Sequence, residues 1–186
     1  MSFLTPRLLE AVSLAARVHG NMTRKGDGLP FLVHPIAVFG LLAHWNANED
    51  TCIAGLLHDV LEDAPEEQRE ALRAEIERQF GEKVVNIIEA LTEDESLPWL
   101  ERKKIYIQHL KETSEDSLLV SCADQTHNTR ALLLALERRG EGVWQKFTAP
   151  KEIKMQQMSL ICRALQERLD PRYTEELAKN IALIDA

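Results

Sequence analysis

The most constraining feature of this chain is an apolar run that ends in a group of ionisable side chains. The run covers residues 52–57, and His58, Asp59, Glu62 and Asp63 follow it. Residues one helical turn apart share a face of an α-helix, so we expect His58 above Glu62 and Asp59 above Asp63. Charges at the end of a buried helix are costly unless they are paired or bind a cation. We therefore interpret this helix end as half of a metal site.

The composition predicts an all-helical fold. With 186 residues the chain is long enough for one domain with a full core, and we expect a single domain spanning residues 1–186. Leu, Ala and Glu dominate, and only 5% of the residues are aromatic, which favours helices. The net charge of −8 argues against general binding to a nucleic-acid polymer or an anionic membrane. A small anionic substrate remains compatible, because it needs only a local basic pocket.

The chain also shows features of a cytoplasmic protein. Its apolar runs are shorter than the roughly 20 residues that a membrane helix needs. The N-terminal residues contain no apolar segment of the kind found in signal peptides. Cys52, Cys122 and Cys162 are odd in number and lie in apolar helical contexts, so we interpret them as buried, reduced thiols.

Apolar periodicity and breaker residues place the helices. A capping region at residues 48–51 opens the helix that runs into His58-Asp59 and ends near residues 64–65. The other helices are expected over residues 6–19, 35–43, 66–79, 84–91, 98–109, 117–138, 150–169 and 173–184.

Two further positions complete a candidate ligand set. A second apolar run leads into Asp124, and His34 lies at the N-terminal edge of the helix that Pro35 opens. The set of His34, His58, Asp59 and Asp124 suits a divalent transition ion. An octahedral ion such as Mn²⁺ would keep two open positions, whereas Zn²⁺ usually closes at four ligands. Taken singly, His34 fits a core or capping residue and Asp124 fits a partner of the backbone or of an arginine, so the residues alone leave this grouping open.

Several motifs, taken together and in order, resemble those of one enzyme family. They are RKGDGLPFLVHP at 24–35, AGLLHDVLED at 54–63, FG at 80–81, LT at 91–92, LERKK at 100–104 and ADQTHNTR at 123–130. This series resembles the HD-domain phosphohydrolases, and within them the hydrolase domain of RelA/SpoT-type enzymes and the small alarmone hydrolases. The resemblance implies an all-α HD-domain bundle with the metal in a central cleft.

The same resemblance implies a role for each matching residue. The metal ligands, usually of Mn²⁺, would be His34, His58, Asp59 and Asp124. The residues that position and activate the attacking water would be Glu62 and Asp63. The substrate-binding residues would be Arg24 and Lys25 at the base pocket and Asn128 at the ribose and phosphates. The implied reaction is hydrolysis of the 3′-pyrophosphate of guanosine tetra- or pentaphosphate to GDP or GTP and pyrophosphate.

Two neighbours of Asp124 can be interpreted from spacing as well. Asn128 lies one helical turn after Asp124 and is expected to face the same cavity. His127 is also close enough to serve as a partner of a metal ligand, but we favour its interpretation as a core residue.

Four positions depart from the family pattern. The family usually has basic residues where this chain has Ser121 and Gln125, and threonines where it has Ala64 and Ala131. These changes remove positive charge and hydroxyl donors but leave the expected metal ligands intact. They keep two alternatives open: hydrolysis of another small nucleotide, such as ppApp or a nucleoside monophosphate, or a catalytically weak nucleotide- or metal-binding partner of a synthetase or toxin.

Overall fold

The protein is built of helices, as the composition predicts. The computed structural model describes residues 5–24, 28–94 and 96–186, and within them the β-structure amounts to an isolated bridge between Thr23 and Pro30. The elements in chain order are α1 (Pro6–His19), α2 (Val33–His44), α3 (Glu49–Leu57), α4 (Val60–Asp63), α5 (Glu66–Phe80), α6 (Glu82–Glu89), α7 (Trp99–Leu110), α8 (Glu115–Arg139), the 3-10 helix η1 (Gly140–Lys146), α9 (Lys151–Gln166) and α10 (Pro171–Asp185).

Side-chain caps mark the starts of several helices. The Thr5 hydroxyl accepts a hydrogen bond from the backbone N–H of Leu8, which starts α1 at Pro6. The side chains of Asn48 and Ser114 cap α3 and α8 in the same way. These caps satisfy backbone donors that have no partner within the helix, and they explain why the starts of α1 and α3 agree with the sequence prediction.

The expected continuous helix through His58-Asp59 is interrupted. Helix α3 ends at Leu57 and α4 begins at Val60, so the two site residues occupy a turn between them. Consecutive side chains on an unbroken helix point about 100° apart. Here His58 Nε2 and Asp59 Oδ1 lie 3.2 Å apart. The prediction of one continuous helix through both residues was therefore wrong, although their side chains do lie close together.

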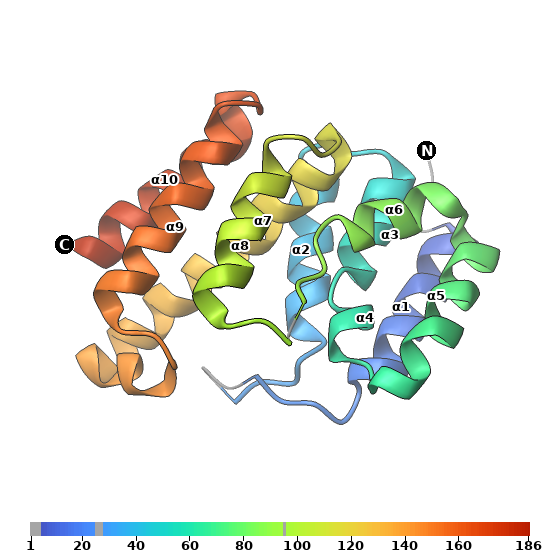
Figure 1. The fold of residues 1–186 in the computed structure, drawn as a ribbon, viewed down its shortest axis with the longest axis horizontal. Helices are drawn as coiled ribbons and strands as arrows, with labels where there is room; N and C mark the ends of the chain where they lie inside the picture. Colours follow the sequence, from blue (N-terminus) through green and yellow to red (C-terminus); the bar gives the residue numbers. More distant parts are fainter. Residues whose placement is uncertain (1–4, 25–27, 95) are drawn as a thin grey trace.

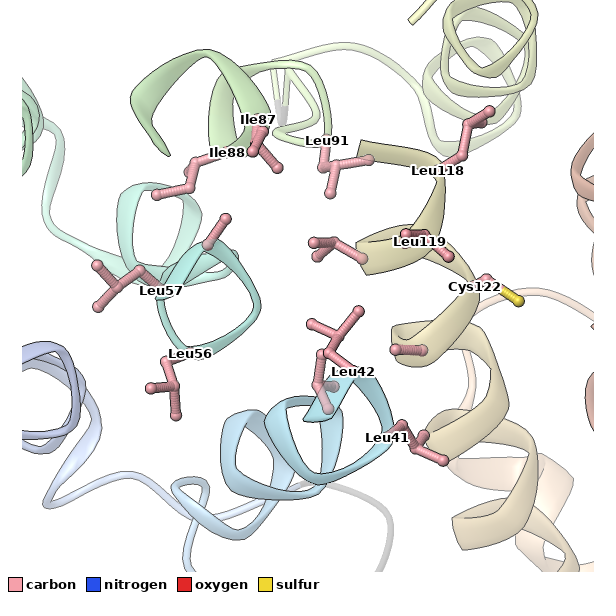
Figure 2. Close-up of a cluster of buried hydrophobic side chains, with 14 of the residues drawn as sticks. Leu41, Leu42, Leu56, Leu57, Ile87, Ile88, Leu91, Leu118, Leu119 and Cys122 are labelled. Atoms are coloured by element: carbon pink, nitrogen blue, oxygen red, sulfur yellow. The ribbon is translucent and has the colours of Figure 1, made fainter. Parts of the chain in front are cut away.

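The long helix α8 forms the centre of the fold. It packs against α2, α3, α9 and α10, and α7 packs on α9 (Figure 1). Figure 2 shows leucine and isoleucine side chains from α2, α3, α6 and α8 pointing into one common cluster. Its largest contributors include Leu42, Leu57, Ile88 and Leu118, which are all fully buried. This cluster fixes the positions of α2, α3 and α8, the elements that carry the candidate ligands.

Gly55 allows α3 and α2 to approach closely. A Cβ atom at this position would stand 2.3 Å from Leu42 Cδ1 of α2, well inside van der Waals contact. The absence of a side chain therefore lets the backbone one turn before His58 lie against α2, the helix that bears His34.

Two sequence expectations, about membrane-spanning helices and about the cysteines, can be compared with this fold. In the described part of the chain, no helix is long and apolar enough to cross a membrane. Cys52, Cys122 and Cys162 are buried free thiols, as predicted.

Candidate metal centre and its cavity

The four predicted ligands come together in the structure. His34 lies in the first turn of α2, His58 and Asp59 lie between α3 and α4, and Asp124 lies in the middle of α8. His34, His58 and Asp59 each offer one ligand atom, and these three atoms lie within 4.8 Å of one another. Asp124 joins them, because its Oδ1 lies 3.1 Å from His34 Nε2 and 3.8 Å from His58 Nε2.

The tautomer of His58 is set by the backbone. Its Nδ1 lies 2.9 Å from the carbonyl oxygen of Gly55 and donates a hydrogen bond to it. The proton of the neutral ring is thus on Nδ1, and the lone pair is on Nε2, which faces Asp59 and Asp124. This is the orientation that a metal-ligating histidine adopts.

His127 sets the tautomer of His34. The Nδ1 atom of His127 lies 3.1 Å from Nη1 of Arg24 and 2.8 Å from Nδ1 of His34. A guanidinium can only donate, so this nitrogen of His127 is an acceptor and His34 Nδ1 carries a proton. The lone pair of His34 is then on Nε2, inside the cluster. The interpretation of His127 as a core residue was wrong: it is half-buried and holds a candidate ligand in place.

Asp124 is held by two amide groups of its own helix. Asn128 Nδ2 donates to Asp124 Oδ1 at 2.6 Å, and Gln125 Nε2 donates to Oδ2 at 2.8 Å. Asn128 in turn accepts a hydrogen bond from Nη2 of Arg24 at 2.8 Å through its Oδ1. Of the predicted substrate residues, Asn128 therefore contacts the predicted ligand Asp124 directly, and Arg24 is linked to Asp124 through Asn128. Lys25 lies outside the described residues.

The donor set fits a divalent cation. The Nε2 atoms of His34 and His58 lie 3.2 Å apart, and their lone pairs face each other and two carboxylates. Such a group needs a positive charge at its centre. Although burial opposes the charged imidazolium, Asp124 and Asp59 raise the pKa values of both His34 and His58 in the metal-free protein. A divalent ion supplies the same charge with better geometry, and two imidazoles with two carboxylates are ligands that such ions accept.

Glu62 lies beside this cluster, and the pKa of its carboxyl group is raised. Burial, together with the charges of Asp59 and Glu93, raises the pKa of the Glu62 carboxyl to about 7. Its Oε2 lies 3.5 Å from the backbone N–H of Glu93. A carboxyl group that titrates near neutrality can accept and return a proton at physiological pH.

One cavity of about 600 Å³ joins all of these groups. That volume is within the range of pockets for small molecules and nucleotides. The predicted site residues that line it are Arg24, His34, His58, Asp59, Glu62, Asp63, Asp124 and Asn128. Its walls also contain cations and apolar side chains to which the sequence prediction gave no role in the site, among them Lys103, Lys154, Val143, Phe147 and Met158.

The four departures from the family pattern have different positions. Ser121, Gln125 and Ala131 line the cavity, whereas Ala64 is buried and is not part of its wall. The Ser121 hydroxyl forms a hydrogen bond of 2.7 Å with the hydroxyl of Tyr106. Three of the four departures thus change the surface that a substrate would meet.

Comparison with protein families gives one match that covers most of the chain. The family model described as "HD domain" matches residues 11–153.

Named relatives share about two thirds of the chain. Guanosine-3′,5′-bis(diphosphate) 3′-pyrophosphohydrolase MESH1 of Xenopus tropicalis is 38% identical over 128 residues, which are 67% of this chain and 69% of that protein. MESH1 of Homo sapiens is 37% identical over 129 residues, again covering 69% of that protein. The bifunctional (p)ppGpp synthase/hydrolase SpoT of Escherichia coli is 32% identical over 132 residues, but these are only 18% of its length.

Two solved structures resemble this protein over most of its length. The protein lmo0812 of Listeria monocytogenes superposes with a TM-score of 0.72 at 27% identity, covering 81% of this chain and 97% of that one. A metazoan ortholog of SpoT, described as hydrolysing ppGpp and acting in starvation responses, superposes with a TM-score of 0.79 over 98% of both chains. At 22% identity, this second likeness shows the fold.

Proposed function

Because the chain belongs to the HD-domain family and is a relative of the guanosine-3′,5′-bis(diphosphate) 3′-pyrophosphohydrolases, we propose that it hydrolyses the 3′-pyrophosphate of guanosine tetra- or pentaphosphate. Water is added across the ester, and the products are GDP or GTP and pyrophosphate. The observation that carries the proposal is the convergence of His34, His58, Asp59 and Asp124 in one cavity with Glu62.

HD-domain hydrolases depend on a divalent metal, and we propose Mn²⁺ as the ion of this protein. The proposed ligands are His34, His58, Asp59 and Asp124. A bound divalent ion polarises a phosphoryl oxygen and lowers the pKa of water. The protein's own contribution is the orientation of the two imidazoles by Gly55 and His127.

The proton transfers fall to the two acids that follow the ligand pair. With a pKa of about 7, Glu62 is suited to accept a proton at its carboxylate from the attacking water and to pass it on afterwards. Asp63 lines the same cavity and would orient that water. Both acids follow Asp59 closely in the chain and line the same cavity, which supports this assignment.

The other residues of the cavity bind the nucleotide. The guanidinium of Arg24 is planar and can stack on a purine or donate to a phosphate. The Asn128 amide can donate to the ribose and phosphate oxygens while it remains near Asp124. Lys25, adjacent in the chain, is proposed to act with Arg24.

One incubation tests the proposal. The Mn²⁺-loaded protein is given ppGpp, ppApp or GMP, and the products are separated and identified. We expect pyrophosphate and GDP from ppGpp, with rates at least about 100-fold lower for Asp59→Ala and Glu62→Gln. Glu67→Gln, which changes an exposed acid on α5, is the control and should keep full activity. Release of orthophosphate from GMP with no reaction of ppGpp would refute the proposal.

A further inference from the structure

The cavity extends beyond the metal centre to a wall that carries two lysines. Lys103 comes from α7 and Lys154 from α9, two helices that pack on each other (Figure 1). Lys103 is paired with the carboxylate of Glu93. Arg102 Nε also lies 4.0 Å from Glu93. Glu93 thus lies close to both Lys103 and Arg102.

Lys154 differs from the other cations of this wall. Its ammonium lies 4.8 Å from the centre of the Phe147 ring and 5.4 Å from that of Trp99. Among residues 5–24, 28–94 and 96–186, the Lys154 ammonium has no ion-pair partner and no hydrogen-bond partner. Burial, together with the charge of Lys103, lowers its pKa. Two aromatic faces offset only part of the cost of removing an ammonium from water.

The α8 wall of the cavity supplies no anionic partner for Lys154. There Ser121 and Gln125 are uncharged, and the acid Asp124 belongs to the candidate ligand group and accepts a hydrogen bond from Gln125. Lysine side chains normally extend into solvent when they can. The position of the Lys154 ammonium inside a cavity, with no carboxylate paired to it, indicates a site that an anionic group completes.

We infer that Lys154, with Lys103 beside it, binds a phosphoryl group of the nucleotide substrate and so determines the affinity for highly phosphorylated nucleotides. The inference rests on the proposed function for the identity of the substrate. The group bound is either the 5′-diphosphate or the far end of the 3′-pyrophosphate. Both present the same phosphoryl oxygens to an ammonium, and a choice of substrates distinguishes them.

Steady-state kinetics of Lys154→Gln test the inference, with Lys154→Arg as the variant that keeps the charge. Lys151→Gln is the matched control: Lys151 lies one turn earlier on α9 and over the Trp144 ring, but it pairs with Glu141 and is not part of the cavity wall. We expect KM for ppGpp to rise about tenfold or more in Lys154→Gln, with kcat nearly unchanged. Lys154→Arg should recover most of the loss, and Lys151→Gln should match the wild-type protein.

A second substrate, guanosine 3′-diphosphate with a free 5′-hydroxyl, identifies the group that is bound. A rise in KM for ppGpp alone assigns Lys154 to the 5′-diphosphate, and a rise for both substrates assigns it to the 3′-pyrophosphate. Kinetics of Lys154→Gln that equal those of Lys151→Gln on both substrates would overturn the inference.

Binding measurements separate this inference from the proposed function. Calorimetric titration of GDP and of inorganic pyrophosphate should show weaker binding of at least one of them to Lys154→Gln. If the wild-type protein fails to hydrolyse ppGpp but binds either anion through Lys154, the proposed function fails and the anion site stands. If ppGpp is hydrolysed and neither anion binds less tightly to the variant, the anion site fails alone.

Discussion

Nδ1 of His19 lies 3.5 Å from Oδ2 of Asp63, behind the candidate metal centre. His19 is only 1% exposed, and its ring lies against that of Phe31 at a centroid distance of 4.7 Å. Neither nitrogen of His19 has a hydrogen-bond partner among the described residues. Burial lowers its pKa to about 4. A neutral imidazole is therefore packed against an acid that we propose to orient water.

The low pKa of His19 predicts acid sensitivity of the fold. Its pKa falls from an ordinary 6.5 in the unfolded chain to about 4 in the folded protein. Between these values the unfolded state binds more protons, so the stability that His19 contributes is complete above pH 6.5 and is lost as the pH falls toward 4. The loss at pH 5 is about 2 kcal/mol. Urea unfolding at pH 7 and pH 5 should show a smaller difference for His19→Leu than for the wild-type protein; equal differences would contradict this assignment.

Glu62 should show the opposite trend in the metal-free protein. Its pKa is raised from 4.5 to about 7, so the folded state holds the extra proton between these values. Stability then falls as the pH rises through this window, and the penalty is complete above pH 7. We expect Glu62→Gln to be more stable than the wild-type protein at pH 8 by roughly 1–3 kcal/mol while it loses activity. Urea unfolding in the presence of a chelator measures this, and a variant of lower stability at pH 8 would refute it.

His127 is expected to control metal affinity without binding the metal. It accepts the Nδ1–H of His34 and so fixes the tautomer of that ring. Removal of such a partner typically costs 10–100-fold in metal affinity. Calorimetric titration with Mn²⁺ should show this loss for His127→Ala and partial recovery for His127→Gln, whose carbonyl oxygen can accept the same proton. His44→Ala removes an exposed histidine on α2 and should bind Mn²⁺ as the wild-type protein does.

Much of the fold follows from local sequence signals. Helix α1 starts at Pro6 and Asn48 caps α3, as expected, and α5 covers Glu66–Phe80, where a helix over residues 66–79 was predicted. These features depend on interactions within one or two turns, which a sequence displays directly. The break between α3 and α4 was missed, because nothing at His58-Asp59 resembles a helix terminator. It is stabilised by packing in the tertiary structure.

The site shows the same division. Motifs at fixed spacing indicated His34, His58, Asp59 and Asp124, because imidazoles and carboxylates can be recognised as metal ligands from the residue type alone. The residues that support them from other elements were not found. Lys154 lies 24 residues beyond the last motif, which ends at residue 130, and the packing of α9 on α7 and α8 brings it to the cavity. A contact between distant helices leaves no signal in a single sequence.

Metal binding should stabilise the fold through the same four residues. A ligand that binds only the folded state adds about 2.7 kcal/mol at 100 times its Kd, which corresponds to a rise in Tm of about 5–10 °C for a chain of this size. We expect Mn²⁺ to raise Tm by this amount in the wild-type protein, and a chelator to reverse it. Asp59→Asn should show little change, because it removes a charged oxygen that lies 3.4 Å from His34 Nε2. His109→Ala, an exposed histidine on α7, is the control and should keep the full rise. An equal rise in Asp59→Asn would place the metal elsewhere.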